Sequence, residues 1–152
     1  MTKDVLVSIS GLQMETLEEG VEHEPIEIIT PASYFCKNGK HYILYDEVAE
    51  GMSGVTRNKI KISSQDKVEV VKTGVVSMHM IFEKHKRNLT YYHTPYGQIP
   101  VGIHTSNMEI QVKEDSISVK VDYELDINHE TWANCEIRMN IKSKNTEDFA
   151  LM

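Results

Sequence analysis

The side chains best placed to do chemistry are polar groups that fall in line with alternating apolar residues. Lys72 continues the spacing of Val68 and Val70, and the carboxylate Glu47 ends a similar stripe on another segment. Side chains in such a line point to one face of a strand, so we expect these groups to enter a protein interior. The candidate set for binding a ligand is Tyr45, Glu47, Lys72, Tyr92, Tyr96, Thr105 and Tyr123.

Two interpretations of this set stay open. Burial of Glu47 or Lys72 alone would be costly, so each needs a partner. In the structural interpretation they pair with each other, and tyrosine hydroxyls complete a satisfied network at one end of the fold. In the functional interpretation they hold the polar head of a small apolar or amphiphilic ligand. The tail would then meet flexible apolar side chains, namely Met78, Met80, Ile137 and Met139.

Catalytic and metal-binding motifs are missing from the sequence. Its seven histidines form no HxH, HxxxH or HExxH motif, and no GxSxG occurs. Asp46 and Glu47 are neighbours on an expected strand, so they point to opposite faces and cannot act as a carboxylate pair. We expect no catalytic residues, no metal and no cofactor. Whether the chain is an enzyme stays open, with a non-enzymatic role favoured.

The composition limits the kinds of binding partner and the cellular compartment that we expect for this protein. The net charge of −7 and the scattered basic residues argue against nucleic acid, because phosphate binding needs concentrated Lys and Arg. No stretch approaches the roughly 20 apolar residues of a membrane-spanning helix, and no secretory signal is visible. Cys36 and Cys135 form no CxxC pair and are expected to be reduced thiols. We therefore expect a cytoplasmic protein that binds neither nucleic acid nor membrane.

The elements that would position the candidate residues are short β-strands. Over 117–127 every apolar residue falls on one parity and every polar residue on the other, which is typical of a half-buried strand. Similar stripes recur along the chain, and Asn38-Gly39 is a strong two-residue hairpin signal. Residues 14–19 and 147–152 are each expected to form only a turn or two of helix. Residues 1–152 are thus expected to form one all-β domain, an antiparallel up-and-down β-barrel of roughly eight to ten strands.

A second apolar face is expected on the hairpin around Asn38-Gly39. Phe35, Tyr42 and Leu44 lie on the parity opposite to Tyr45 and Glu47. A barrel strand needs only one apolar face, so these residues are candidates for an interface, a homodimer among the alternatives. Cover by residues 14–19 or by the C-terminal tail would explain the pattern equally well.

A set of short motifs resembles a known family over nearly the whole chain. Their order is Tyr45–Glu47, Thr56–Ile62, Lys72–Gly74, Tyr92–Gly97, Thr105 and Tyr123–Leu125. In this order they resemble the bacterial YwiB-like proteins, domain of unknown function 1934. That family is similar to the calycins, the lipocalin-like barrels, so the resemblance implies a barrel of this shape and no established activity. It also implies a preference for Arg where this chain has Lys72.

Overall fold

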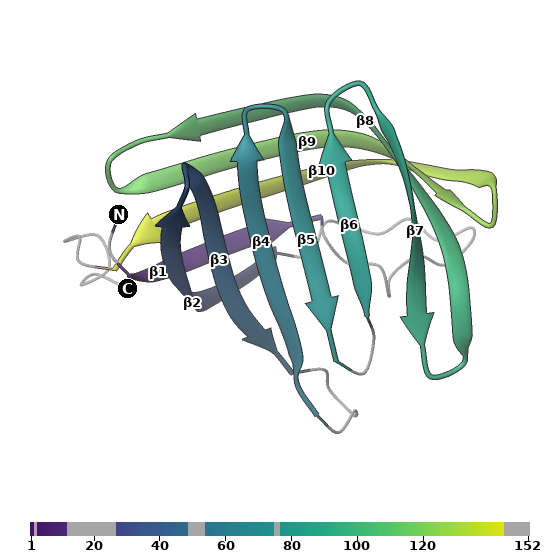
Figure 1. The fold of residues 1–152 in the computed structure, drawn as a ribbon, viewed down its shortest axis with the longest axis horizontal. Coiled ribbons are helices and arrows are strands. Elements are labelled where there is room, and N and C mark those ends of the chain that lie inside the picture. The colour runs from purple at the N-terminus through teal and green to yellow at the C-terminus, as the bar shows by residue number, and fades with distance from the viewer. Residues whose placement is uncertain (2, 12–26, 49–53, 75–76, 145–152) are drawn as a thin grey trace.

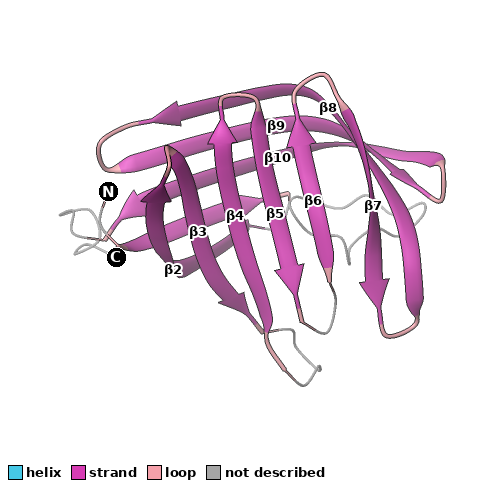
Figure 2. Ribbon diagram, viewed as in Figure 1, coloured by secondary structure: helices cyan, strands magenta, loops and turns pink. Residues whose placement is uncertain are grey.

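The computed structural model describes residues 1, 3–11, 27–48, 54–74 and 77–144, which form one antiparallel sheet of ten strands (Figure 1). The strands are β1 (Asp4–Ser10), β2 (Glu27–Lys37), β3 (Lys40–Glu47), β4 (Thr56–Ser64), β5 (Lys67–Thr73), β6 (Met78–Glu83), β7 (Arg87–Thr94), β8 (Gly97–Val112), β9 (Ser116–Ile127) and β10 (Glu130–Ser143). The described residues form strands and loops (Figure 2), and they include no helix long and apolar enough to cross a membrane. Residues 14–19 and 147–152 lie outside the described ranges.

The sheet curls into a nearly closed barrel. Its strand order is β6-β5-β4-β3-β2-β1-β10-β9-β8-β7, so β6 and β7 are the two ends that must meet. They meet at a bridge between Ser77 and His93, whose backbone groups exchange hydrogen bonds of 3.0 and 2.9 Å. Near the other end of this seam, the His85 N–H donates to the Thr105 carbonyl at 2.8 Å. The predicted antiparallel barrel is confirmed, with a strand number at the upper end of the expected range.

Two groups of strands cross in this barrel. In Figure 1, β1, β9 and β10 run across the view, whereas β3 to β7 run from top to bottom. β8 belongs to both groups because it bends between the two directions. Its register against β9 shifts between Thr105 and Asn107, a bulge at the middle of the strand. Bulges of this kind allow a long strand to turn a corner of a barrel.

The alternating residues fill the barrel interior as predicted. Ile117, Val119, Val121, Tyr123 and Leu125 on β9 are all buried. They face other buried apolar side chains, of which Phe82, Ile43, Ile60 and Met80 are among the largest. The hairpin signal is confirmed as well, since Asn38 and Gly39 have φ values of 54° and 74°, the positive values that a type I′ turn requires.

One pair of neighbouring strands separates partway along its length. β2 and β3 are paired only from the Asn38-Gly39 turn to Ser33 and Leu44. Beyond that point β2 continues along β1 as far as Glu27, while β3 continues along β4 as far as Glu47. The two strands therefore diverge, and the opening between them is called the β2/β3 cleft below.

Candidate ligand-binding site

A row of polar side chains crosses the inner face of the sheet beside the β2/β3 cleft. Tyr45 on β3 is directly opposite Asn58 on β4, which is opposite Lys72 on β5. All three are buried because they alternate with core residues on the same strands. The next row, Ile43, Ile60 and Val70, is entirely apolar and buried. The polar row thus marks the end of the apolar core on this side of the barrel.

Glu47 joins this row through two contacts to one carboxylate oxygen. Glu47 Oε1 lies 3.1 Å from Lys72 Nζ and accepts a hydrogen bond of 3.0 Å from Asn58 Nδ2. The structure therefore brings Glu47 and Lys72 together, as the structural interpretation of the sequence expects. The tyrosine hydroxyls expected to complete the network do not join it, because the polar partner that completes it is the amide of Asn58.

The network leaves one acceptor unused. Asn58 is only 2% exposed, and its Oδ1 has no hydrogen-bond partner in the part of the chain that the structure describes. Its orientation is fixed, because Asn58 Nδ2 donates to Glu47 Oε1 and to the Thr56 carbonyl. Buried amide oxygens are nearly always satisfied in folded proteins. An acceptor left open in this way calls for a donor from outside the network.

Tyr45 carries a hydroxyl donor on the strand next to Asn58. No described residue makes a hydrogen bond to it, although its ring is buried. Burial, and then the negative charge of Glu47, raise the pKa of Tyr45 well above its ordinary value, so the phenol keeps its proton. Tyr45 and Asn58 are cross-strand neighbours, whose Cβ atoms lie about 4.5–5.5 Å apart in such pairs. These two residues on neighbouring strands therefore carry a hydroxyl donor and a buried, unpartnered acceptor.

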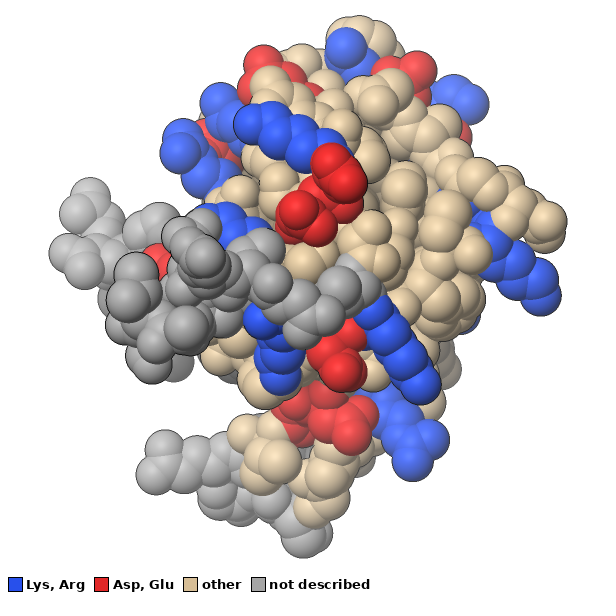
Figure 3. All heavy atoms as spheres, turned by 90° about the vertical axis from the view of Figure 1, so that its left-hand side faces the viewer, with Lys and Arg blue, Asp and Glu red and all other residues tan. Residues whose placement is uncertain are grey.

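Tyr45 and Asn58 both line the β2/β3 cleft, which has a volume of about 630 Å³. Its walls include Tyr45 and Asn58 from the inner face and four charged residues, Asp4, Asp46, Arg57 and Lys144. The remaining lining residues are Thr30, Pro31, Ala32, Ser33 and Leu44. Acidic and basic side chains are interspersed on the left-hand side of Figure 1, which faces the viewer in Figure 3. The cleft therefore combines a polar floor with walls of mixed charge.

Among the described residues, the part of β2 before Ser33 has no strand partner on the side of the cleft. The Tyr34 N–H donates to the carbonyl of Lys3, the residue before β1, at 2.8 Å. Because backbone groups alternate in direction along a strand, those of Pro31 and Ser33 point the other way, toward β3 and the cleft. Pro31 has no N–H, and its carbonyl accepts a hydrogen bond of 3.2 Å from the Thr30 hydroxyl. A proline at such an edge discourages pairing with another strand.

Two further tyrosines of the predicted set lie elsewhere. Tyr92 is half-buried against the core, next to the His93 that closes the β6–β7 seam. The expected interior position of Tyr96 is wrong, because its side chain is 99% exposed. Tyr96 occupies the tight turn between β7 and β8, outside both strands, where inward alternation no longer applies.

Thr105 and Tyr123 form a second polar position inside the barrel. They are cross-strand neighbours on β8 and β9, and both are buried. The Tyr123 ring packs edge-on against Phe82 with ring centres 5.1 Å apart. Burial, followed by the neighbouring Cys135 thiol, raises the pKa of Tyr123. Thr105 Oγ1 has no hydrogen-bond partner among the described residues. The predicted set is therefore divided between two places rather than gathered in one.

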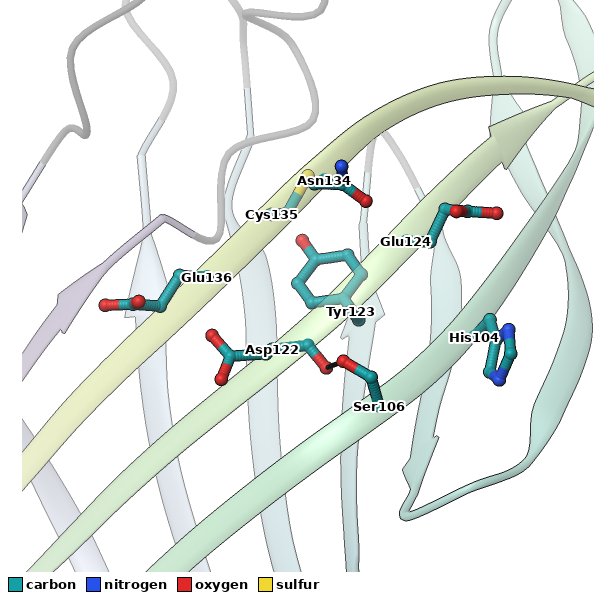
Figure 4. A pocket seen from close by; sticks show the side chains of 8 residues that line it. All are labelled: His104, Ser106, Asp122, Tyr123, Glu124, Asn134, Cys135 and Glu136. Atoms are coloured by element: carbon teal, nitrogen blue, oxygen red, sulfur yellow. Dashed lines mark hydrogen bonds between the residues drawn. The ribbon is translucent and has the colours of Figure 1, made fainter.

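A second pocket, of about 460 Å³, lies on β8, β9 and β10 over this position. Figure 4 shows the Tyr123 hydroxyl directed toward Cys135, with Asp122, Glu124 and Glu136 around them. The Ser106 hydroxyl donates to the Asp122 carbonyl at 3.2 Å. No group of three or more His, Cys, Asp or Glu among the described residues could hold a metal ion. This pocket offers carboxylates but no unpartnered buried side-chain atom of its lining residues, so the β2/β3 cleft is the better candidate.

The candidate interface residues lie together on the outer face of β2 and β3. Phe35 and Leu44 are 43% and 37% exposed. The rings of Phe35 and Tyr42 stack with centres 4.7 Å apart, and the Lys61 ammonium lies 5.8 Å from the centre of the Tyr42 ring. These three residues, Phe35, Tyr42 and Leu44, are called the aromatic patch below. Their position on the outer face agrees with the alternation of side chains along the strands, which placed them opposite to Tyr45 and Glu47. The residues expected as an alternative cover, 14–19 and 147–152, are outside the described ranges.

Sequence reasoning missed Asn58, the residue that connects Glu47, Lys72 and the cleft. The signal was present, because Asn58 shares the inward parity of Ile60 and Ile62 on β4. Thr56, on the same parity, is also buried at the end of the barrel. An amide in an apolar stripe is as informative as a charged residue there, since it too must find partners.

Comparisons with known proteins agree on the family and the fold. The family model described as "Domain of unknown function (DUF1934)" matches residues 7–139. The uncharacterized β-barrel protein YwiB of Bacillus subtilis (strain 168) is 24% identical over 114 residues, covering 75% of this chain and 78% of that protein. The crystal structure of the ywiB protein from Bacillus subtilis superposes with a TM-score of 0.76 at 18% identity, covering 93% of this chain and 92% of the other. The similarity to calycins stays a prediction.

Proposed function

Since the chain belongs to the DUF1934 family, whose matched relative is a β-barrel, we propose that it is a binding barrel for a small molecule. The ligand enters the β2/β3 cleft and rests on the polar row formed by Tyr45 and Asn58, with Lys72 behind them. The observation that carries the proposal is Asn58 Oδ1, a buried acceptor without a partner among the described residues. Few convergent polar groups in a concave site are the usual signature of ligand binding.

The rest of the ligand is proposed to be partly apolar. The row continues from Lys72 to Met78 on β6, which is buried and flexible in its side chain. Met80, Ile137 and Met139 are packed deeper in the core, so an apolar tail would have to displace them. The polar head is therefore proposed to bind at the cleft, with the tail limited to the end of the core near Met78.

A binding role is proposed ahead of catalysis because Glu47 and Lys72, the charged pair of the polar row, already contact each other. The Glu47 carboxylate oxygen that faces the network contacts both Lys72 and Asn58. A general base needs a lone pair directed at the substrate, which this oxygen does not offer. A cytoplasmic location is part of the proposal, supported by the two free thiols Cys36 and Cys135.

A fragment screen by NMR tests the binding role. The uniformly ¹⁵N-labelled protein is titrated with a library of small molecules of different charge and polarity. We expect backbone shifts to cluster at Tyr45, Asp46, Arg57 and Asn58, because these residues line the cleft. Binders that shift only residues elsewhere, or a library without binders, would contradict the proposal.

Self-association through the aromatic patch of Phe35, Tyr42 and Leu44 is a second candidate function. The observation that favours it is the exposure of Phe35 together with its stacking on Tyr42. Exposed aromatic groups of this kind are enriched at protein interfaces. Light scattering of the unchanged protein and of Phe35→Asp tests it. A dimer that becomes a monomer in the variant is expected, and an unchanged protein that is monomeric would rule the idea out.

A further inference from the structure

We propose that the outer face of β2, β3 and β4 binds an acidic, partly apolar segment of another protein. The binding surface consists of the aromatic patch and four lysines that border it, and it is called the basic-aromatic surface below. Its members are Phe35, Lys37, Lys40, Tyr42, Leu44, Lys59 and Lys61. This role goes beyond ligand binding in the β2/β3 cleft and does not depend on it.

The register of three neighbouring strands places these residues in adjacent rows on one face of the sheet (Figure 1). Phe35 on β2 lies opposite Tyr42 on β3, which lies opposite Lys61 on β4. In the next row, Leu44 lies opposite Lys59. Residues directly opposite each other on neighbouring strands have their side chains on the same face. The apolar side chains are therefore bordered by lysines along β4.

Two further lysines border the surface at the hairpin turn. Lys37 and Lys40 lie directly opposite each other, and each is two residues from an aromatic member, Phe35 or Tyr42, on its own strand. Alternation along the strands puts all four side chains on the same face. Like charges directly opposite each other destabilise a hairpin. A negatively charged partner placed over the two lysines would reduce this repulsion.

Most of this positive charge has no local counter-charge. Three of the four lysines form no ion pair with a residue that the structure describes, namely Lys37, Lys40 and Lys59. The chain as a whole carries a net charge of −7. Positive charge is therefore concentrated on one face of an otherwise acidic protein.

Two acidic residues of the described strands adjoin the surface, and each already has a basic neighbour. Glu69 lies 3.9 Å from the Lys61 ammonium and 3.0 Å from the His79 imidazole. Asp46 lies opposite Arg57. Neither carboxylate balances the remaining lysines of the surface, so these stay available to an acidic partner.

The combination of positive charge and exposed apolar groups indicates the kind of partner. Acidic side chains would meet the lysines, while an apolar or aromatic side chain packs on the exposed Phe35 ring. A second copy of this chain fits less well, because a symmetric dimer would bring the same lysines against each other. Nucleic acids and anionic membranes extend beyond the surface, where the net charge of −7 repels them. A short acidic segment contacts the basic-aromatic surface alone.

Fluorescence anisotropy with synthetic peptides tests the inference. The probe is a fluorescein-labelled peptide that alternates glutamate with leucine and phenylalanine, and the full-length protein is added to it. Matched peptides carry glutamine in place of every glutamate, or serine in place of every apolar residue. We expect the glutamate probe to bind in the micromolar range and both matched peptides to bind at least about tenfold more weakly. Raising the salt concentration from about 50 to about 500 mM should weaken the binding of the glutamate probe about tenfold.

Charge reversal at the turn tests where the probe binds. Lys37→Glu combined with Lys40→Glu should weaken binding at least about tenfold, because two attractive contacts become repulsive. The control combines Lys84→Glu with Lys86→Glu, which changes the net charge equally at the β6–β7 turn, outside the surface. This control should bind the probe normally. Urea midpoints confirm that both double variants are folded.

Several results would overturn the inference. They are an absence of saturable binding, equal affinity for the glutamate and glutamine peptides, and equal weakening by the two double variants. Tighter binding of a polythymidine oligonucleotide or of phosphatidylserine vesicles would assign the surface to a different class of partner. A dimer in light scattering that Phe35→Ser dissociates would assign it to a second copy. None of these results bears on the cleft, whose ligands are followed by the backbone shifts of Tyr45 and Asn58.

Discussion

Replacing Lys72 with methionine removes the positive charge that Glu47 faces at the end of the barrel core. Methionine keeps most of the length of the side chain, so the loss of the charge dominates over the loss of packing. The Lys72 side chain is 10% exposed and the Glu47 side chain 25% exposed, so this pair is largely but not fully removed from water. Lys72→Met leaves Glu47 with only its hydrogen bond from Asn58.

The expected loss of stability is intermediate between that of a surface pair and that of a buried pair. Removing one partner of a fully buried pair costs about 3–5 kcal/mol, and exposed pairs contribute about 0–1 kcal/mol. Because Glu47 keeps some water and the contact to Asn58, we expect Lys72→Met to lower the free energy of unfolding by about 2 kcal/mol. Glu47→Gln keeps a hydrogen-bond acceptor for Lys72 and should cost about 1.5 kcal/mol.

A double-mutant cycle measured by urea unfolding isolates the pair. With both changes in place neither charge is left alone, so the double variant should lose about 1.5 kcal/mol and reveal a coupling of about 2 kcal/mol. Lys86→Met is the control, because Lys86 is paired with Glu83 at 3.3 Å while its side chain is 68% exposed. It should change stability by less than about 0.5 kcal/mol. Additivity of the two inner changes to within about 0.5 kcal/mol would refute the reasoning.

Three further predictions concern the same region and the hairpin above it. Gly74→Ala should cost about 1–3 kcal/mol in urea unfolding, because its Cβ would lie 2.7 Å from the Val55 carbonyl oxygen, and an unchanged midpoint would contradict this. Lys72→Arg should raise the free energy of unfolding by about 0.5–1 kcal/mol through a forked contact to Glu47, whereas a loss would show that the space is too small. Burial lowers the pKa of His41, which lies 2.6 Å from the Tyr34 hydroxyl, so the unfolded chain binds the proton more readily. Urea midpoints should therefore fall as the pH decreases below about 6.5, and His41→Asn should reduce that dependence.

The barrel could be predicted because its strongest strands have one purely apolar parity. The stripe from Ile117 to Leu125 allows no other regular structure, and the Asn38-Gly39 turn fixes the register of β2 and β3. Strand β7 was not predicted, because its apolar residues lie on the outer face of the sheet and its polar residues on the inner face. It turns Asn88 and Thr90 toward the interior side of the sheet and leaves Leu89 and Tyr91 exposed.

The candidate site could be predicted only in part. A buried charge needs an opposite partner, and this rule predicts the contact of Glu47 with Lys72 as one of two interpretations of the sequence. The cleft itself could not be derived from parity. It depends on the separation of β2 from β3 at Ser33, because the part of β2 from Glu27 to Ala32 pairs with β1 and not with β3. Such a divergence is a property of the closed barrel and not of any one strand.

The pairing of β1 with β10 has a consequence for how the barrel assembles. Val5 lies opposite Ser143, so a ladder in the middle of the sheet joins residues separated by most of the chain's length. The seam, by contrast, falls between β6 and β7, which follow each other directly in sequence. The entropic penalty of loop closure is therefore largest for the β1–β10 ladder. The contact between β6 and β7 that closes the barrel joins segments that are close in sequence, so its penalty is small. A circular permutant that joined the ends of β10 and β1 and opened the chain between β6 and β7 would turn the slowest contact of the barrel into a local one.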